Sequence, residues 1–421
     1  MKNNKTNKEY DWQKGMDPND IFSNIGKLMR MNISYGRDDI VGFPGTTPLN
    51  IAECVYAEYL GYHANNIGLH TTGNDKEVGF GGTQTAEEEV IAMAADLMGV
   101  TLEEVDGYIS SGGTEANFMG CWIGRNSSEN PQKTALLCSS LTHNSITAKT
   151  VDILMNRDRK CLKLIPTDKS GHILVEKMIE AVEVSINDFD NFVIVGNAGT
   201  TMLGSVDDIP RMSFALGELK KIYPHKKFHF HVDAAFGGFV VPFISNIPHI
   251  GFRNHHVDTI TLDAHKMGLT PYGSGIILSR KGLFARTSTK APYFPGADAS
   301  FSGSRSGASA LSTWAAMKYM GKDGYAKTTQ RLMKVTSEIK CILHNNGFEI
   351  FKNDINIIGV KGSLPRWIQK DFRVHVQESF PENLSHPENG KIISVWNIVV
   401  MNHTKPELIE KIISQLKRKV G

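Results

Sequence analysis

Short apolar segments alternate with longer segments of helical periodicity through the middle of the chain. Two of the longer segments, 115–126 and 144–156, each follow an apolar run that is too short to be a helix. Such runs, separated by helices, are typical of strands that are buried on both faces. The pattern predicts an α/β fold in which helices cover both sides of a mostly parallel, seven-stranded sheet. The candidate strands are 107–110, 135–139, 161–166, 192–197, 228–233, 259–263 and 274–279.

The two ends of the chain follow a different pattern. The first fifteen or so residues predict a loose arm, and 19–62 predicts short helices interrupted by a loop. Beyond residue 300, a long helix over 308–345 precedes two strand-like segments and a closing helix at 405–419. We therefore expect three units. They are an N-terminal arm with helices (1–62), a large α/β domain (63–309) and a smaller C-terminal α+β domain (310–421).

The first strong helix is predicted over 83–99. Thr85 and Glu88 have the spacing of a capping box, and Gly99 would end the helix. Apolar side chains recur every three or four positions, which predicts one buried face. They are Val90, Ile91, Ala94, Leu97 and Met98.

The charge of the chain is nearly balanced, with 46 Lys and Arg residues, 44 Asp and Glu residues and a net charge of +2. This balance gives no reason to expect nucleic acid or an anionic membrane as a partner. No apolar stretch approaches the roughly 18 residues of a membrane span, and the polar N-terminus is not a secretory signal. Five cysteines without metal-ligand spacing predict small buried side chains, no metal site and a cytoplasmic protein.

A glycine-rich turn, SSGGTEAN (110–117), follows the first candidate strand. Glycines and hydroxyl side chains that lead into a helix expose backbone N–H groups at the positive helix end, which favours an anion. The spacing is neither that of a Walker loop nor that of GxGxxG. A tight turn with a helix cap is an equally good interpretation of this motif alone.

Asp233 ends a candidate strand, and Lys266 and His143 follow two others, at the edge where sheets of this class bind ligands. A carboxylate there can keep a pyridine nitrogen protonated, and an imidazole can stack on the ring. Partial desolvation lowers the pKa of a lysine and frees its amine to form a Schiff base. Together Asp233 and Lys266 predict pyridoxal 5′-phosphate (PLP). Taken singly, a helix-capping aspartate, a solvated lysine and a structural histidine are the simpler interpretations.

Seven motifs occur in a recognisable order: SGGTEAN, THNS, NAGTTMLGSVDD, HVDAAFGG, DAHKMG, APYF and GSRSG. In content and order they resemble the group II PLP-dependent amino-acid decarboxylases, and most of all the archaeal L-tyrosine/L-aspartate decarboxylase type. The resemblance runs from about residue 75 to the C-terminus and is weak before it. It implies the fold of the PLP-dependent aminotransferases (fold type I) and a homodimer whose subunits share active sites.

The resemblance implies that Lys266 forms the Schiff base and that Asp233 holds the ring nitrogen. His143 would stack on one face of the ring and Ala235 would pack on the other. The substrate amine then displaces Lys266 to give an external aldimine, and loss of CO2 gives a quinonoid whose Cα needs a proton. The implied acid is Tyr293, in an aperiodic segment typical of a mobile lid. An aromatic anchor for that loop is the alternative.

The resemblance also implies that Gly113 and Thr114 hold the phosphate, with His265 on the same side. Thr200 would lie close to the cofactor. Arg305, in GSRSG, either binds a substrate carboxylate or a phosphate, or forms a structural ion pair, and the sequence favours neither.

The expected reaction is decarboxylation of an L-amino acid, with tyrosine or aspartate as the first candidates and glutamate or other aromatic amino acids after them. A carbon–carbon lyase of the sphingosine-phosphate lyase type, which uses a similar framework, is the alternative. The glycine-rich loop 69–84 is a candidate lining of the substrate entrance. The polar stretch 373–391 predicts an insertion in the small domain, without an assigned role.

Overall fold

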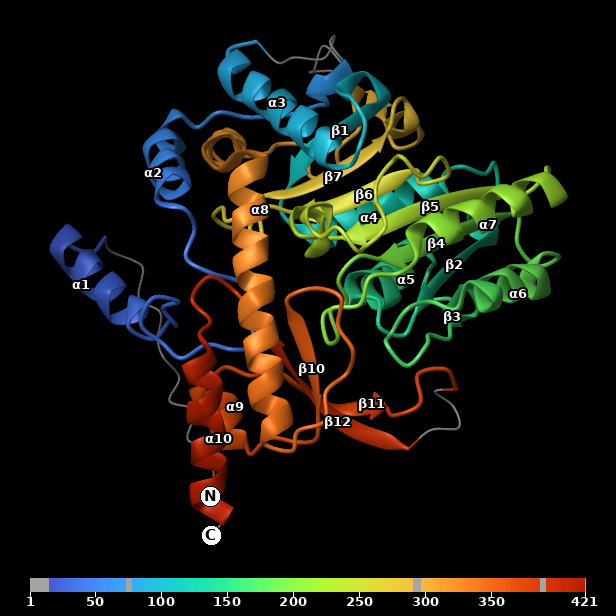
Figure 1. The fold of residues 1–421 in the computed structure, drawn as a ribbon. Coiled ribbons are helices and arrows are strands. Elements are labelled where there is room, and N and C mark those ends of the chain that lie inside the picture. Colours follow the sequence, from blue (N-terminus) through green and yellow to red (C-terminus); the bar gives the residue numbers. More distant parts are fainter. Residues whose placement is uncertain (1–14, 73–77, 291–296, 387–390, 421) are drawn as a thin grey trace.

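Seven strands form the main sheet, in the order β1-β7-β6-β5-β4-β2-β3 (Figure 1). The structure is a computed structural model that describes residues 15–72, 78–290, 297–386 and 391–420. Neighbouring strands are parallel except at β7, which runs antiparallel to β1 and β6. The predicted strands and the mostly parallel α/β sheet are therefore confirmed. The strands are β1 (Val105–Ser110), β2 (Thr134–Ser139), β3 (Leu162–Ile165), β4 (Asn191–Asn197), β5 (Lys227–Ala234), β6 (Thr259–Asp263) and β7 (Gly275–Arg280).

Helices cover both faces of this sheet. Alternate residues of a strand point to opposite sides, and in β1, β2 and β4 the residues on both sides are buried. On one side of β5, Phe230 shares an apolar cluster with Ile209 of α7. On the other side, His231 lies so close to α4 that a Cβ at Gly120 would overlap its ring. Glycine therefore sets the distance between α4 and the sheet. The helices here are α4 (Gly113–Arg125), the π-helical η5 (Ser145–Thr150), α5 (Val151–Leu154), α6 (Val175–Ser185) and α7 (Ile209–Ile222).

Helix α3 (Gly81–Leu97) packs beside β1, and the five apolar side chains predicted to share its inner face are buried. The predicted capping box is wrong. The backbone N of Gln84 already donates to the carbonyl of Phe80 at 3.1 Å, so the helix begins four residues before Thr85. Thr85 lies inside the helix, where its N–H needs no cap.

A second sheet of three strands, in the order β10-β12-β11, lies beside the lower half of the longest helix (Figure 1). Part of 373–391, the polar stretch predicted to be an insertion, forms the edge strand β11, which pairs with β12 across a bulge. The polar composition of β11 is explained by its position at the edge of the sheet, where most of its side chains face solvent. The elements of this part are β10 (Ile357–Lys361), α9 (Arg366–Asp371), β11 (Val376–Pro381), β12 (Ile392–Val399) and α10 (Pro406–Val420).

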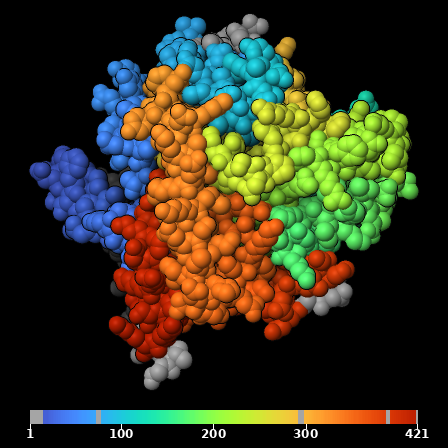
Figure 2. All heavy atoms as spheres, in the orientation of Figure 1, coloured from blue at the N-terminus to red at the C-terminus, as the bar shows by residue number. Residues whose placement is uncertain are grey.

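Helix α8 (Gly307–Asn345) connects the two sheets and matches the predicted long helix. Gly321 interrupts it, with φ 54° and ψ 178°. Its first half packs on α2 (Asn50–Tyr59) and α3. Helix α1 (Pro18–Met29) stands off from the body of the molecule and forms the dark blue projection at the left of Figure 2.

Among the residues that the structure describes, no helix has both the length and the apolar character needed to cross a membrane.

All five cysteines are free thiols. Cys121, Cys138 and Cys161 are buried as predicted. Cys54 and Cys341 are exposed, contrary to the prediction, because they lie on outward faces of α2 and α8.

Candidate active site

A cavity of about 470 Å³ lies at the carboxyl edge of the main sheet. This is the edge at which parallel α/β sheets bind ligands, and the volume is within the range of small-molecule sites. All eight residues predicted to bind the cofactor line the cavity. They are Gly113, Thr114, His143, Thr200, Asp233, Ala235, His265 and Lys266. Tyr293, the predicted acid, lies outside the described residues.

The turn from β1 into α4 forms one wall of the cavity. Gly113 is the first residue of α4, so its N–H and that of Thr114 are among the helix donors without an intrahelical partner. The turn passes close to the start of β7, since a Cβ at Gly275 would lie 2.5 Å from the carbonyl carbon of Gly112. His265 borders the same turn, with Cε1 3.1 Å from a Cβ built at Gly112. The groups predicted to hold a phosphate are thus neighbours.

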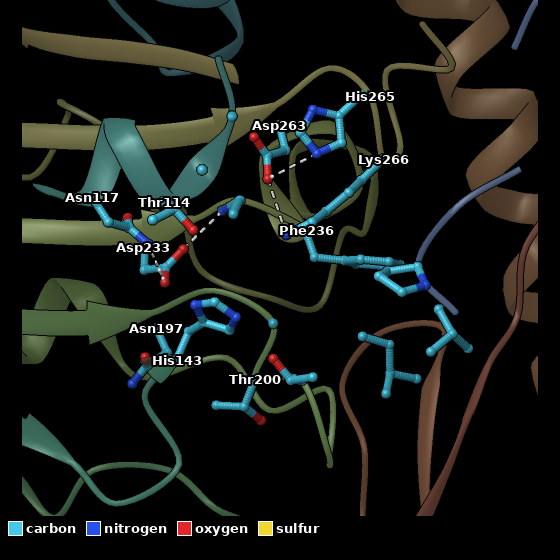
Figure 3. Close-up of a pocket in the computed structure, with 18 of the residues that line it drawn as sticks. Thr114, Asn117, His143, Asn197, Thr200, Asp233, Phe236, Asp263, His265 and Lys266 are labelled. Carbon is cyan, nitrogen blue, oxygen red and sulfur yellow. Dashed lines mark hydrogen bonds and ion pairs between the residues drawn. The ribbon is translucent and has the colours of Figure 1, made fainter. Parts of the chain in front are cut away.

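Lys266 is held by Asp263, which precedes it in the same turn (Figure 3). Nζ of Lys266 lies 3.0 Å from Oδ2 of Asp263, and Nε2 of His265 lies 3.6 Å from the same oxygen. Burial alone would lower the pKa of Lys266, but the carboxylates of Asp263 and Asp233 outweigh it and raise that pKa. The expectation that desolvation frees the amine is therefore wrong. Two buried carboxylates stabilise the ammonium form instead.

Asp233 is anchored at the end of β5 by two donors. Nδ2 of Asn117 donates to its Oδ2 at 2.8 Å, and the backbone N of Ala235 donates to its Oδ1 at 3.1 Å (Figure 3). The residue is only 9% exposed, so these bonds offset part of the cost of burying a charge. Asn117 and Asp263 are site residues that the sequence analysis does not single out. Their signal is position, because Asn117 closes the SGGTEAN motif and Asp263 ends an apolar strand.

His143 follows β2 and lies near Asp233 (Figure 3). Its Nδ1 is 2.9 Å from Oγ of Ser145, which orients the ring. Burial lowers the pKa of His143 and outweighs the opposite effect of Asp233, so the imidazole is neutral at pH 7. Thr200 is also fixed, because its Oγ1 lies 2.7 Å from Oγ of Ser205.

Arg305 belongs to a buried ion pair and is not among the described residues that line the cavity. Its Nη1 pairs with the carboxylate of Glu87 and donates to the carbonyl of Ile109 at 3.1 Å. Nη2 donates to the carbonyl of Gly68 at 2.6 Å. Glu87 also lies 2.5 Å from Nδ1 of His70. Of the two interpretations of Arg305, the structural ion pair is the one observed.

The small sheet supplies another wall, which the sequence analysis does not anticipate. Asn397 of β12 is fully buried there, and its Nδ2 donates to the carbonyl of Thr201 at 2.9 Å. Its Oδ1 has no hydrogen-bond partner within the described part of the chain. His375 lies beside it in the lining, with its ring edge-on to Phe43 at a centroid distance of 4.6 Å. Burial lowers the pKa of His375.

The donor set of the cavity fits PLP group by group. The start of α4 offers N–H groups to a phosphate, Asp233 offers a carboxylate to a protonated ring nitrogen, and Lys266 offers an amine to an aldehyde. The buried Nδ1 of His265 has no partner among the described residues, so it is available to an anion.

Comparisons with known proteins give consistent results. Residues 2–361 match the family model described as the pyridoxal-dependent decarboxylase conserved domain. The chain is 33% identical over 419 residues to the L-aspartate/L-glutamate decarboxylase of Pyrococcus horikoshii, which covers 96% of this chain and 97% of that protein. It is 30% identical over 415 residues to the tryptophan decarboxylase of Clostridium sporogenes, with 94% of each chain covered.

The fold is shared with a solved structure of L-methionine decarboxylase from Streptomyces sp. 590, bound to L-methionine methyl ester. The TM-score is 0.81 at 16% identity, over 96% of this chain and 95% of that chain. The predicted fold type is therefore confirmed.

Proposed function

The chain belongs to the pyridoxal-dependent decarboxylase family, and from this membership we propose that it decarboxylates L-tyrosine or L-aspartate. PLP is its cofactor, and amino-acid decarboxylation is its reaction. When bound, the cofactor supplies an aldehyde that captures the substrate amine and a protonated ring that accepts the electron pair left by departing CO2. The observation that carries the proposal is that Lys266 and Asp233 line one cavity.

In this proposal Lys266 binds the cofactor aldehyde, and Asp263 takes part as the group that holds the proton of the lysine amine. The separation of 3.0 Å between Lys266 Nζ and Asp263 Oδ2 supports that assignment. Asp233 holds the proton on the ring nitrogen and so stabilises positive charge there. Its two fixed donors support this role, because they leave the carboxylate little freedom to turn.

The remaining lining residues position the cofactor. Gly113, Thr114 and His265 hold its phosphate at the start of α4, where the helix dipole favours a dianion. A neutral His143 presents a flat face to the ring, and Ala235 packs on the other side. Thr200 lies close by, held by its own hydrogen bond.

Tyr293 is the proposed acid that protonates Cα. A tyrosine hydroxyl suits the task because it is a neutral donor at physiological pH. Tyr293 itself lies outside the described part of the chain. The strands that precede and follow its segment in the sequence, β8 (Thr289–Lys290) and β9 (Ala297–Asp298), pair with each other.

The lining bears on the choice between the two substrates. The names of the relatives cover acidic and aromatic amino acids. Among the described lining residues there is no arginine, and Lys266 is the one lysine. Burial lowers the pKa of His375 and so favours its neutral ring. The side-chain carboxylate of an aspartate substrate would therefore meet no permanent positive charge at His375. The unpartnered Oδ1 of Asn397 can accept a hydrogen bond from a phenol. These features favour tyrosine.

The function is tested with purified protein, PLP and a panel of tyrosine, aspartate, glutamate and tryptophan. The wild-type enzyme is expected to show an absorbance band near ~420 nm, absent in Lys266→Ala. It is expected to release CO2, with the highest kcat/KM for tyrosine. Asn397→Leu should raise KM for tyrosine more than for tryptophan, which has no phenol.

Two results would contradict the proposal. Absence of the ~420 nm band in the wild-type enzyme after PLP is added would remove Lys266 from its role. Cleavage of a phosphorylated amino alcohol without CO2 release would favour the lyase alternative.

A homodimer with shared active sites is part of the proposal. Helix α1 exposes an apolar stripe, and none of its residues is buried. The stripe contains Ile21, Phe22, Ile25, Leu28 and Met29. An amphipathic helix that buries none of its residues against the described part of its own chain is expected to pack on a second copy. Sedimentation of wild-type protein and of a variant without residues 1–29 tests this.

The cytoplasm is the proposed location, and the five free thiols support it, because disulfides are rare in reducing compartments. The three units 1–62, 63–309 and 310–421 stay a proposal, which limited proteolysis tests.

A further inference from the structure

A line of hydrogen bonds runs behind Asp233 through α4, β5 and β6. It links four buried side chains in the order His229, Thr259, His231 and Asn117. We propose that the last three are positioning residues, which fix a hydrogen-bond donor on Asp233 and so keep its carboxylate directed at the cofactor ring. This inference rests on the proposed role of Asp233 and deepens it.

The contacts are continuous. Nε2 of His229 lies 2.8 Å from Oγ1 of Thr259, which lies 2.9 Å from Nδ1 of His231. Nε2 of His231 lies 3.0 Å from Oδ1 of Asn117, whose Nδ2 lies 2.8 Å from Oδ2 of Asp233. All four distances are those of good hydrogen bonds. The four side chains behind Asp233 belong to residues that are at most 1% exposed.

The charge of Asp233 fixes the direction of every bond. A carboxylate only accepts hydrogen bonds, so Asn117 must present its NH2 group and turn its oxygen toward His231. That oxygen needs a donor, so His231 carries its proton on Nε2, and its Nδ1 accepts from the hydroxyl of Thr259. The hydroxyl oxygen in turn accepts from His229. All donors therefore point toward Asp233, and polarisation along the line strengthens the last bond.

Burial and packing hold the two histidines in this state. Burial lowers the pKa of His229 and of His231 to about 3, so both rings are neutral at pH 7. A neutral imidazole has one donor nitrogen and one acceptor nitrogen, so a hydrogen bond accepted on one side of the ring fixes a donated bond on the other. A Cβ at Gly120 would overlap the ring of His231, and one at Gly124 would lie 2.6 Å from Cδ2 of His229. Both rings are therefore packed closely against α4, which limits their movement.

The hydroxyl of Thr259 supports this tautomer of His231, because it donates to the Nδ1 lone pair. Without it, the proton of His231 is free to move to Nδ1. The amide of Asn117 can then reverse and set its oxygen against the carboxylate of Asp233, which is repulsive. A network that merely satisfied buried polar groups would not transmit this change to Asp233.

Thr259→Val tests the inference, with Thr261→Val as the matched control. Both threonines are fully buried on β6, and residues two apart on a strand point to the same side. In the register of β5 with β6, Thr261 pairs with Asp233 and Thr259 pairs with His231. Oγ1 of Thr261 nevertheless has no hydrogen-bond partner in the described chain. If only closeness to Asp233 mattered, Thr261→Val would perturb the site more than Thr259→Val. If the hydrogen-bonded line matters, Thr259→Val would perturb the site more.

Two measurements report on the ring nitrogen without relying on turnover: the dissociation constant of PLP and the 15N chemical shift of the ring nitrogen in enzyme loaded with labelled PLP. For Thr259→Val we expect a dissociation constant roughly threefold to tenfold higher, the worth of about one hydrogen bond. We also expect a smaller protonated fraction of the ring nitrogen. Thr261→Val and the hydroxyl-retaining Thr259→Ser should match the wild-type enzyme.

A second variant covers the case in which Thr259→Val does not fold, as judged by circular dichroism. Asn117→Asp keeps the size of the side chain and sets a second carboxyl group against Asp233. Two buried carboxyl groups this close share a proton, so the negative charge available to the ring nitrogen falls and both readouts should shift further. Equal dissociation constants and 15N shifts in the two valine variants would overturn the inference. So would a wild-type result for Asn117→Asp. Failure of the proposed function looks different, because wild-type enzyme with bound PLP would then release no CO2 from tyrosine or aspartate.

Discussion

Oδ2 of Asp263 lies 3.0 Å from Nζ of Lys266, three residues further along the same turn. The pair reverses the usual expectation for a buried lysine, whose pKa falls when water is removed. Here burial is outweighed by the two carboxylates, and the pKa of Lys266 is raised. An amine attacks an aldehyde only in its neutral form, so the proton must leave Lys266 before this residue could hold the cofactor.

Asp263→Asn is expected to lower the pKa of Lys266, since burial then acts against fewer negative charges. The rate at which cofactor-free protein acquires the ~420 nm band should therefore reach its plateau at a lower pH than in the wild-type protein. Stopped-flow absorbance between about pH 6 and 10 measures this. Asp39→Asn, which removes a carboxylate from the exposed pair with Lys411, is the control. Superimposable pH profiles for Asp263→Asn and wild type would contradict the prediction.

Gly113→Ala should weaken PLP binding. A Cβ at this position would lie 2.6 Å from Oδ2 of Asp263 and 3.2 Å from Cβ of Ala235, so the turn or both neighbours must move. Gly82→Ala in α3 is the control, because a Cβ there meets nothing within 4 Å. The control should leave the dissociation constant unchanged and gain up to about 1 kcal/mol of stability. Equilibrium dialysis and urea unfolding measure both, and equal affinity in the two variants would count against a tight turn.

Arg305→Met should destabilise the fold by about 3–5 kcal/mol, because it leaves the carboxylate of Glu87 buried without its cation. Lys221→Met, which breaks the exposed pair with Glu218, is expected to cost less than about 1 kcal/mol. Urea unfolding of both variants measures the difference. If the two losses were similar, the buried pair would have no special weight.

His172 predicts a loss of stability at alkaline pH. Its Nε2 lies 2.6 Å from Oδ2 of Asp354, and chiefly this bond, opposed by burial, raises its pKa to about 9. The pKa in the unfolded chain is about 6.5, so folding favours the charged ring. The gain is fully present below about pH 6.5 and disappears as the pH rises through about 9.

In that window the free energy of unfolding should fall by roughly 1–3 kcal/mol in the wild-type protein and stay nearly level in His172→Gln. Urea midpoints at several pH values measure it. His225→Gln, at an exposed position, is the control and should follow the wild-type curve. A parallel fall in His172→Gln would assign the effect to another group.

The main sheet could be predicted because strands buried on both faces need apolar runs, and each predicted run overlaps an observed strand. The reversed direction of β7 escaped prediction, since an apolar run looks the same in either direction. The connection 264–274 nevertheless carried a signal, because it lacks the helix that a crossover to a parallel neighbour needs. The capping-box prediction at Thr85 and Glu88 was wrong because the same spacing recurs by chance inside helices.

The site residues also differ in how far the sequence could predict them. Lys266 follows β6 and Asp233 lies at the end of the neighbouring β5, so their meeting is a consequence of a local pattern. Asn397 and His375 reach the cavity only because the small sheet docks beside the large one, and this depends on packing between distant segments. No spacing within the chain encodes it.

Gly321 divides α8 into two parts with different attachments. Before the glycine, Oγ of Ser312 donates to the carbonyl of Ala52 in α2; beyond it, Nη2 of Arg331 donates to Oδ1 of Asn402, which precedes α10. The backbone ladder is broken between them, so the halves need not open together. Amide hydrogen exchange should therefore resolve this one helix into two protection classes, the first following the core of the main sheet and the second following the small sheet.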